Sequence, residues 1–299
     1  MPERRSFYGG QAVIEGVMIR GPNTVAVACR RPDGNIALRT ETLGGVYVSL
    51  LRRLPLLRGI LVLWETLALG MRALIFSSSV QLGEEEKEAG PWSIWTMVLA
   101  ALAFVAILFF AGPVLVAGWL EDAFGETPWV VVIESLVRLA VLIGYLLLIG
   151  LLPDVRRVYA YHGAEHKTIN ALESGDPLDI PHVQRHSVTH IRCGTSFLLT
   201  VVLISVIVFA PLGTPDLWLR IVSRIVLIPV IAGLAYEVIR LGSKFHHHPV
   251  VGTLMRPNLA LQALTTREPD DDQVAVAIHA LKQAMAMEKQ VEVEKPSAP

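Results

Sequence analysis

The chain has 299 residues, of which 53% are apolar and 18% are charged, and its mean hydropathy is +0.50. This apolar excess is not typical of a soluble protein of this length. Lysine and arginine number 26 against 27 aspartate and glutamate, so the net charge of −1 argues against nucleic-acid binding, which requires a basic surplus. The two cysteines, Cys29 and Cys193, exclude a disulfide framework and a cysteine-only zinc site.

Residues 1–45 predict a small β-rich cytoplasmic segment. Stretches 24–30 and 35–41 have strand character and flank a Pro-Asp-Gly turn. The stretch 9–22 is dense in glycine, which indicates bulges, tight turns or a close approach of the backbone to a ligand. Glu15 and Arg20 lie in it. They are candidates for a site carboxylate and an anion clamp, or alternatively for an ion pair at a strand edge.

Residues 46–80 are strongly apolar but are interrupted by charged residues, among them Arg52, Arg53 and Arg72. A helix with arginine on one face and apolar residues on the other lies comfortably at the lipid headgroups. We therefore predict an interfacial or re-entrant amphipathic helix, bent at Pro55 and Gly70.

Four further stretches, 93–118, 129–152, 196–212 and 218–240, are long and apolar enough to cross a bilayer, which takes about 20 residues. In the second stretch, Glu134 and Arg138 lie one turn apart and can partly neutralise each other. In the fourth, Arg220 and Arg224 must reach the headgroups or find a partner such as Glu134. The fold class predicted is mainly α: a polytopic membrane protein with transmembrane pairs in 93–152 and 196–241.

The loops predict which way the chain crosses the bilayer. Loops 121–126 and 211–217 carry acidic but no basic residues, whereas Arg156, Arg157 and Arg192 lie on the opposite side. Basic residues collect on the cytoplasmic side of membrane proteins. The lipid bilayer is thus the expected partner, and we expect a multi-pass protein of the cell (inner) membrane with both termini in the cytoplasm.

The loop 153–195 is rich in histidine and contains the pattern H-x-x-E-H at 162–166. On a helix, His162 and His166 share one face and can bind one divalent metal ion, zinc above all. Glu165 beside them is placed to act as a general base. Helical spacing runs from Asp154, an expected N-cap, to a stop at Ser174 and Gly175. The alternative is a surface helix whose histidines lie at the headgroups.

A catalytic zinc ion needs a third protein ligand. Glu173 follows His166 by seven residues on the same face, and His190 and Cys193 come just before the third span. We regard all three as candidates. A lone buried cysteine can also be simply a small apolar residue.

The cytoplasmic C-terminal block, 242–299, contains three consecutive aspartates at 270–272. They are followed by apolar residues at helical spacing, Val274, Ile278, Leu281 and Met285. This pattern predicts an acid-capped amphipathic helix. The charged tail after Glu288 is predicted to be disordered.

With these motifs in view, the chain resembles the YqhQ-like family of multi-pass membrane proteins, for which metal dependence is proposed. The resemblance covers most of the chain. It rests on GGQAVIEGVMIRGP at 9–22, YHGAEHKTINALE at 161–173, IRCGTSFL at 191–198 and LTTREPDDDQVAVAIHAL at 264–281. Carried over, it implies site roles for Glu15, Arg20, His162, Glu165, His166, Glu173, His190 and Cys193. Where the family has proline, this chain has Ile191, which weakens the match at His190.

These patterns favour a zinc-dependent membrane hydrolase that acts at the cytoplasmic membrane face on a membrane peptide or a lipid. A metal-binding scaffold or assembly factor without catalysis is the alternative. A transporter is less favoured, because the sequence shows no internal repeat.

Overall fold

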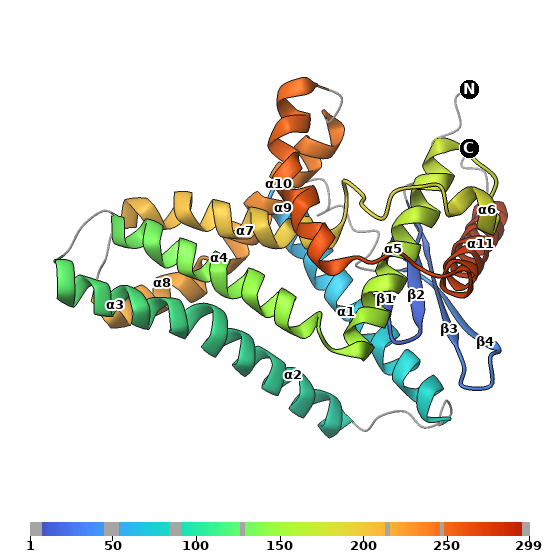
Figure 1. Cartoon of the computed structure of the whole chain (residues 1–299), viewed down its shortest axis with the longest axis horizontal. Coiled ribbons are helices and arrows are strands. Elements are labelled where there is room, and N and C mark those ends of the chain that lie inside the picture. Colours follow the sequence, from blue (N-terminus) through green and yellow to red (C-terminus); the bar gives the residue numbers. More distant parts are fainter. Residues whose placement is uncertain are drawn as a thin grey trace.

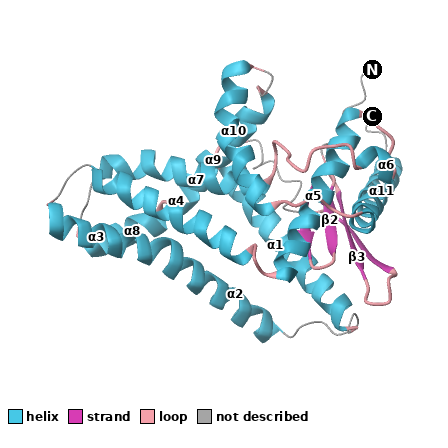
Figure 2. Ribbon diagram, in the orientation of Figure 1, coloured by secondary structure: helices cyan, strands magenta, loops and turns pink. Residues whose placement is uncertain are grey.

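The structure is a computed structural model that describes residues 8–44, 54–83, 91–125, 129–212, 216–245 and 248–294. At one end of the molecule, a small antiparallel sheet is packed between helices (Figure 1). Long helices project from it to form the other end (Figure 2). The fold is therefore mainly α with an N-terminal β segment, as the sequence predicts.

The sheet has the order β1-β2-β3-β4, and every neighbouring pair is antiparallel. Its strands are β1 (Gly9–Val13), β2 (Gly16–Arg20), β3 (Thr24–Arg30) and β4 (Ile36–Thr42). The two strands predicted at 24–30 and 35–41 are thus confirmed to within one residue. The glycine-dense stretch forms the β1–β2 hairpin, whose turn holds Glu15 at a φ of 51°.

Each face of the sheet buries one apolar set, because side chains alternate along a strand. Val17 and Ile19 face a core shared with helices α5 (Pro153–Ser174) and α11 (Asp271–Glu294). Met18 faces the opposite core, which α1 (Leu57–Leu82) covers. A short helix, α6 (Ile180–Val183), follows α5. Segments from both ends of the chain thus meet in one globular unit.

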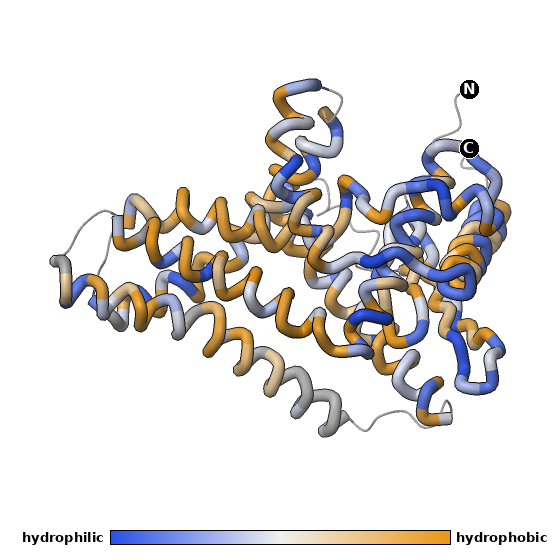
Figure 3. The backbone as a smooth tube through the Cα atoms, viewed as in Figure 1, coloured by the Kyte–Doolittle hydropathy of each residue, from blue (hydrophilic) through white to orange (hydrophobic). Residues whose placement is uncertain are grey.

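The long helices carry the hydrophobic residues, as α4 and α7 show in Figure 3. The described residues give four candidate spans: Leu57–Leu82, Leu99–Ala123, Val132–Ile149 and Gly194–Leu212. They are built from α1, α2 (Pro91–Ala106), the π-helix η3 (Ile107–Ala111), α3 (Gly112–Phe124), α4 (Trp129–Ile149), α7 (Gly194–Phe209) and the short η4 (Ala210–Leu212). The predicted membrane character is confirmed.

The predicted helix 218–240 is not one straight span. It consists of α8 (Leu217–Val226) and α9 (Ile228–Lys244), which meet at an angle of 44°. Pro229 in the first turn of α9 explains the break, since proline has no N–H to continue the hydrogen bonds of the preceding helix.

The segment predicted as a bent interfacial or re-entrant helix at 46–80 also differs, because its helix Leu57–Leu82 is long and apolar enough to cross a membrane. Residues 45–53 lie outside the described ranges, and α1 then runs through Gly70 without a break. A β-carbon on Gly70 would lie 2.3 Å from Oε1 of Gln11. This glycine therefore allows close packing against β1 rather than a bend.

The C-terminal block begins with α10 (Pro249–Thr265). In α11 the predicted stripe is buried at Val274, Ile278 and Leu281. The prediction of disorder after Glu288 was wrong as far as Glu294, where α11 ends. Glu288 is buried and accepts hydrogen bonds from the Asn23 N–H and the Thr24 hydroxyl, so the β2–β3 turn fixes the end of this helix.

Charged residues between the long helices pair with one another. Glu134 lies 2.8 Å from Arg138 and 3.1 Å from Arg224, and all three are buried. Arg138 also donates to the carbonyl of Phe109, in the π-helix. The predicted pairing of Glu134 with Arg138 is confirmed, and of the two alternatives considered for the arginines of the fourth stretch, Arg224 pairs with Glu134 whereas Arg220 pairs with Glu121. We call Glu134, Arg138 and Arg224 the bundle ion cluster.

Candidate metal centre

Helix α5 positions both histidines of the H-x-x-E-H pattern. It begins with Pro153, whose fixed φ suits the first turn, and ends at Gly175, which adopts a left-handed φ of 78°. The expected N-cap, Asp154, lies instead within the first turn. His162 and His166 are one turn apart, and their ring centres are 4.3 Å from each other.

A backbone carbonyl fixes the ring of His162. Nδ1 lies 2.9 Å from the carbonyl oxygen of Thr265, at the end of α10. Because a carbonyl can only accept, Nδ1 carries the proton and Nε2 presents a lone pair. Gly163 lets this chain segment approach, since a β-carbon there would lie 2.1 Å from the carbonyl oxygen of Arg267.

His166 is held in the same way from another loop. Its Nδ1 lies 2.7 Å from the carbonyl oxygen of Val188, so Nε2 again presents a lone pair. The ring is only 1% exposed, and burial lowers its pKa, which favours the neutral imidazole that binds metals.

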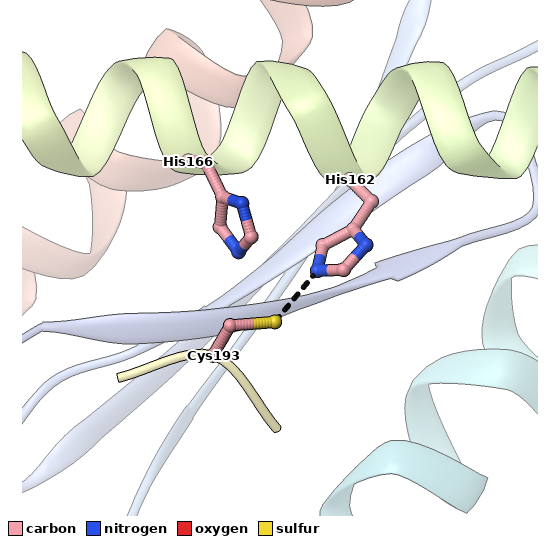
Figure 4. Close-up of side chains that lie close together, drawn as sticks. All are labelled: His162, His166 and Cys193. Carbon is pink, nitrogen blue, oxygen red and sulfur yellow. Dashed lines mark hydrogen bonds between the residues drawn. The ribbon is translucent and has the colours of Figure 1, made fainter. Parts of the chain in front are cut away.

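Cys193 supplies a third donor. Its Sγ lies 3.2 Å from Nε2 of His162, and the close-up shows it between the two rings (Figure 4). Cys193 is also the N-cap of α7, where Sγ accepts the N–H of Thr195 at 3.3 Å. One donor atom from each of His162, His166 and Cys193 lies within 4.8 Å of the others.

Glu165 lies beside these donors and is 5% exposed. The backbone N–H of Gly10 donates to its carboxylate, but Oε2 has no hydrogen-bond partner among the described residues. Burial raises its pKa above the ordinary range of a carboxyl group. A β-carbon on Gly10 would lie 3.1 Å from Cδ of Glu165, so glycine is needed at this contact.

A cavity of about 50 Å³ joins these groups, and its lining includes Gly9, Gly10, His162, Glu165, His166 and Cys193. A water molecule needs about 10–15 Å³ of such space. The cavity therefore has room for water or a small substrate group next to all three donors.

Two predicted ligands, Glu173 and His190, lie outside the three-donor group. Nε2 of His190 donates to Glu173 at 3.2 Å, and its Nδ1 accepts the N–H of Arg192 at 3.3 Å. Both ring nitrogens are therefore engaged. Glu173 also pairs with the Arg192 side chain, and the two partners His190 and Arg192 together outweigh burial and leave its pKa below the ordinary range. This arrangement places His190 and Arg192 in the wall of the cavity.

Glu15 and Arg20, the other predicted site residues, form separate ion pairs. Glu15 pairs with Arg157 of α5, which lowers the carboxyl pKa, and Arg20 pairs with Glu65 of α1. Neither lines the cavity. They join the hairpin to its two flanking helices.

The sequence analysis did not predict the backbone groups that orient the site, namely the carbonyls of Val188 and Thr265 and the N–H of Gly10. Its only signals were the density of glycine in 9–22 and the glycine inside the H-x-x-E-H pattern. Backbone partners have no residue type to identify them.

The residues present fit a metal ion. Imidazole nitrogen and cysteine sulfur are ligands that zinc prefers. A cation would also compensate the carboxylate of Glu165, which is costly to bury with an oxygen lacking a partner in the described chain. The group is thus a possible His-His-Cys metal site.

Comparisons with known proteins identify the family of the chain. A family model described as "Protein of unknown function (DUF1385)" matches residues 54–287. The "Uncharacterized protein YqhQ" of Bacillus subtilis (strain 168) is 37% identical over 295 residues, covering 94% of this chain and 93% of that protein. No solved structure matches the chain.

Proposed function

The chain belongs to the DUF1385 family, and we propose that it is a zinc-dependent membrane hydrolase whose metal is held by His162, His166 and Cys193. One observation carries this proposal. Three donor atoms gather in a cavity beside a buried carboxylate oxygen that has no partner among the described residues. Catalytic zinc sites have three protein ligands and an open position, whereas structural sites have four ligands.

Each of the four site residues would have its own role in the reaction. His162 and His166 present fixed Nε2 lone pairs, and Cys193 adds a sulfur. Bound zinc would supply Lewis acidity, which makes water nucleophilic near neutral pH. Glu165 would take a proton from that water and return it to the leaving group, and its raised pKa suits a group that both accepts and donates.

The position of α1 supports a site on the same side of the membrane as the sheet. Val80, near the end of α1, packs on the sheet that precedes this helix in the chain. A crossing by α1 would separate them by the bilayer, about 30 Å thick. We infer that α1 stays on one side and that four crossings remain. By the positive-inside rule, that side is the cytoplasm.

A structural metal site is the second candidate, favoured by the backbone contacts of the rings. His162 joins α5 to Thr265, and His166 joins it to Val188. A metal there would hold α5 to Cys193 at the start of α7 without catalysis.

Metal content of the purified protein tests the site. We expect about one zinc per chain in the wild type, and loss of it in the double variant His162→Ala/His166→Ala and in Cys193→Ala. His186→Ala is the matched control, because His186 pairs with Asp176 outside the group. Equal metal content in all four proteins would refute the site.

Two measurements then separate the enzyme from the scaffold. Glu165→Gln should retain zinc but change the peptide or lipid products of membranes, measured by mass spectrometry against the wild type. In the cobalt-substituted protein, added azide should alter the visible spectrum if a ligand position is open. Unchanged products and an unresponsive spectrum would favour the scaffold.

A further inference from the structure

The outer edge of β1 lies next to the candidate site. β1 is the first strand in the sheet order, so among the described residues only β2 pairs with it (Figure 1). An unpaired edge presents a row of N–H and C=O groups that can bind another strand.

The pairing shows which groups point outward. Gly10 lies opposite Ile19 in the β1–β2 ladder, yet its N–H donates to Glu165 of α5. The N–H and C=O of one strand residue point to the same side, and the side alternates along the strand. Gly10 and Ala12 therefore direct their backbone groups away from β2.

These outward groups have spare capacity. Neither the C=O of Gly10 nor the N–H and C=O of Ala12 has a partner within the described part of the chain. Gly9 and Gly10 are exposed and also line the cavity with His162, His166 and Cys193. Because glycine has no side chain, it leaves this edge open where it meets the site.

We propose that the edge of β1 binds an extended polypeptide segment as a fifth strand and so delivers a peptide bond to the cavity. This inference rests on the proposed hydrolase, and it selects a peptide over a lipid. Alternating donors and acceptors at the strand repeat match an extended peptide backbone, which lipid headgroups do not present.

The resulting reaction is peptide hydrolysis. The C–N bond of the bound segment breaks, the hydroxyl of water is added to the acyl carbon, and the remaining proton goes to the departing amine. Glu165, whose carboxylate is tied to the same strand through Gly10, is the group that transfers this proton. Cys193 caps α7, which begins a candidate membrane span. The peptide bond that is cut would therefore lie close to the first turn of this helix.

Binding can be tested without turnover. The probe is a short fluorescein-labelled peptide of alternating valine and threonine, added to the full-length protein after zinc removal and followed by fluorescence anisotropy. We expect it to bind about tenfold or more tightly than the same peptide N-methylated at every residue, because methylation removes the donors that two or more backbone bonds need.

Ala12→Pro removes the outward N–H and leaves the bonds to β2 in place, since proline is tolerated at such edge positions. Ala12→Val keeps the N–H and controls for added bulk. We expect about tenfold weaker probe binding for Ala12→Pro only. Wild-type zinc content in both variants would show that the site is intact.

Equal binding of the methylated and unmethylated probes would overturn the proposal. It would also be overturned if phosphatidylglycerol vesicles displaced both probes from the protein to the same extent. These outcomes differ from failure of the proposed function. Absence of zinc, or products unaffected by Glu165→Gln, would refute the hydrolase while leaving probe binding unchanged.

Discussion

Two of the regions that bury ionisable groups treat them in opposite ways. In the bundle ion cluster, Glu134 is paired with Arg138 and Arg224, although Nη1 of Arg224 has no hydrogen-bond partner among the described residues. At the candidate metal centre, Glu165 has one backbone donor and one oxygen without a partner in the described chain. The first arrangement pairs its one carboxylate with two guanidinium groups of the chain itself, whereas the second leaves a carboxylate and three metal donors available to an external ligand. Buried charge thus serves packing in one region and chemistry in the other.

Removing the shared carboxylate should have the largest effect. Glu134→Ala leaves Arg138 and Arg224 buried without it, which should lower the free energy of unfolding by about 3–5 kcal/mol. Unfolding in mixed detergent micelles measures this. Glu41→Ala, which breaks contacts with the more exposed Arg39 and Arg72, should cost under about 1 kcal/mol. Equal losses would show that the cluster is not a structural element.

Zinc should raise the free energy of unfolding only in proteins whose metal centre is intact. At free zinc about 100-fold above the dissociation constant, the wild type should gain about 2.7 kcal/mol over the chelated protein. Cys193→Ala should lose this gain, and Glu134→Ala should keep it. The measurement is thermal unfolding with and without EDTA, and a zinc response that persists in Cys193→Ala would contradict the ligand assignment.

A methyl group at the Gly10–Glu165 contact should have an intermediate effect. On Gly10 it would lie 2.4 Å from the Met18 carbonyl oxygen, so Gly10→Ala should cost about 1–3 kcal/mol and displace Glu165. Gly9→Ala is the matched control, because no other group of the described residues lies within 4 Å of the point that its methyl carbon would occupy. Similar unfolding curves for the two variants would contradict the close approach.

The smallest effect should come from Glu15 and its pH dependence. Because Arg157 lowers the pKa of Glu15 in the folded protein, its contribution is present above the unfolded pKa, ordinarily 4.5, and is lost as pH falls through the folded pKa. Wild type and Glu15→Gln should therefore differ above pH 4.5 and converge in acid. The difference should stay under about 1 kcal/mol, since Arg157 is half exposed. A stability difference between the two proteins that grows as the pH falls would contradict a lowered pKa of Glu15 in the folded protein.

How far the sequence predicted the structure depends on the range of each interaction. Local spacing was enough to place His162, Glu165 and His166 on one helix face, and hydropathy was enough to find the bundle. The choice of Cys193 over Glu173 or His190 depends on the path of the loop before α7, which no local pattern encodes. The order of the tail beyond Glu288 depends on contacts with Asn23 and Thr24, more than 260 positions away.

The carbonyl of Thr265 that orients His162 lies 103 positions further along the chain. During synthesis, His162 leaves the ribosome long before this partner exists, and the candidate span Gly194–Leu212 and the bent pair α8–α9 lie between them in the chain. The first histidine can be locked only in a nearly finished chain. If the centre binds a metal as proposed, its loading would be a late step in biogenesis, and a chain truncated before residue 265 would lack the group that orients His162.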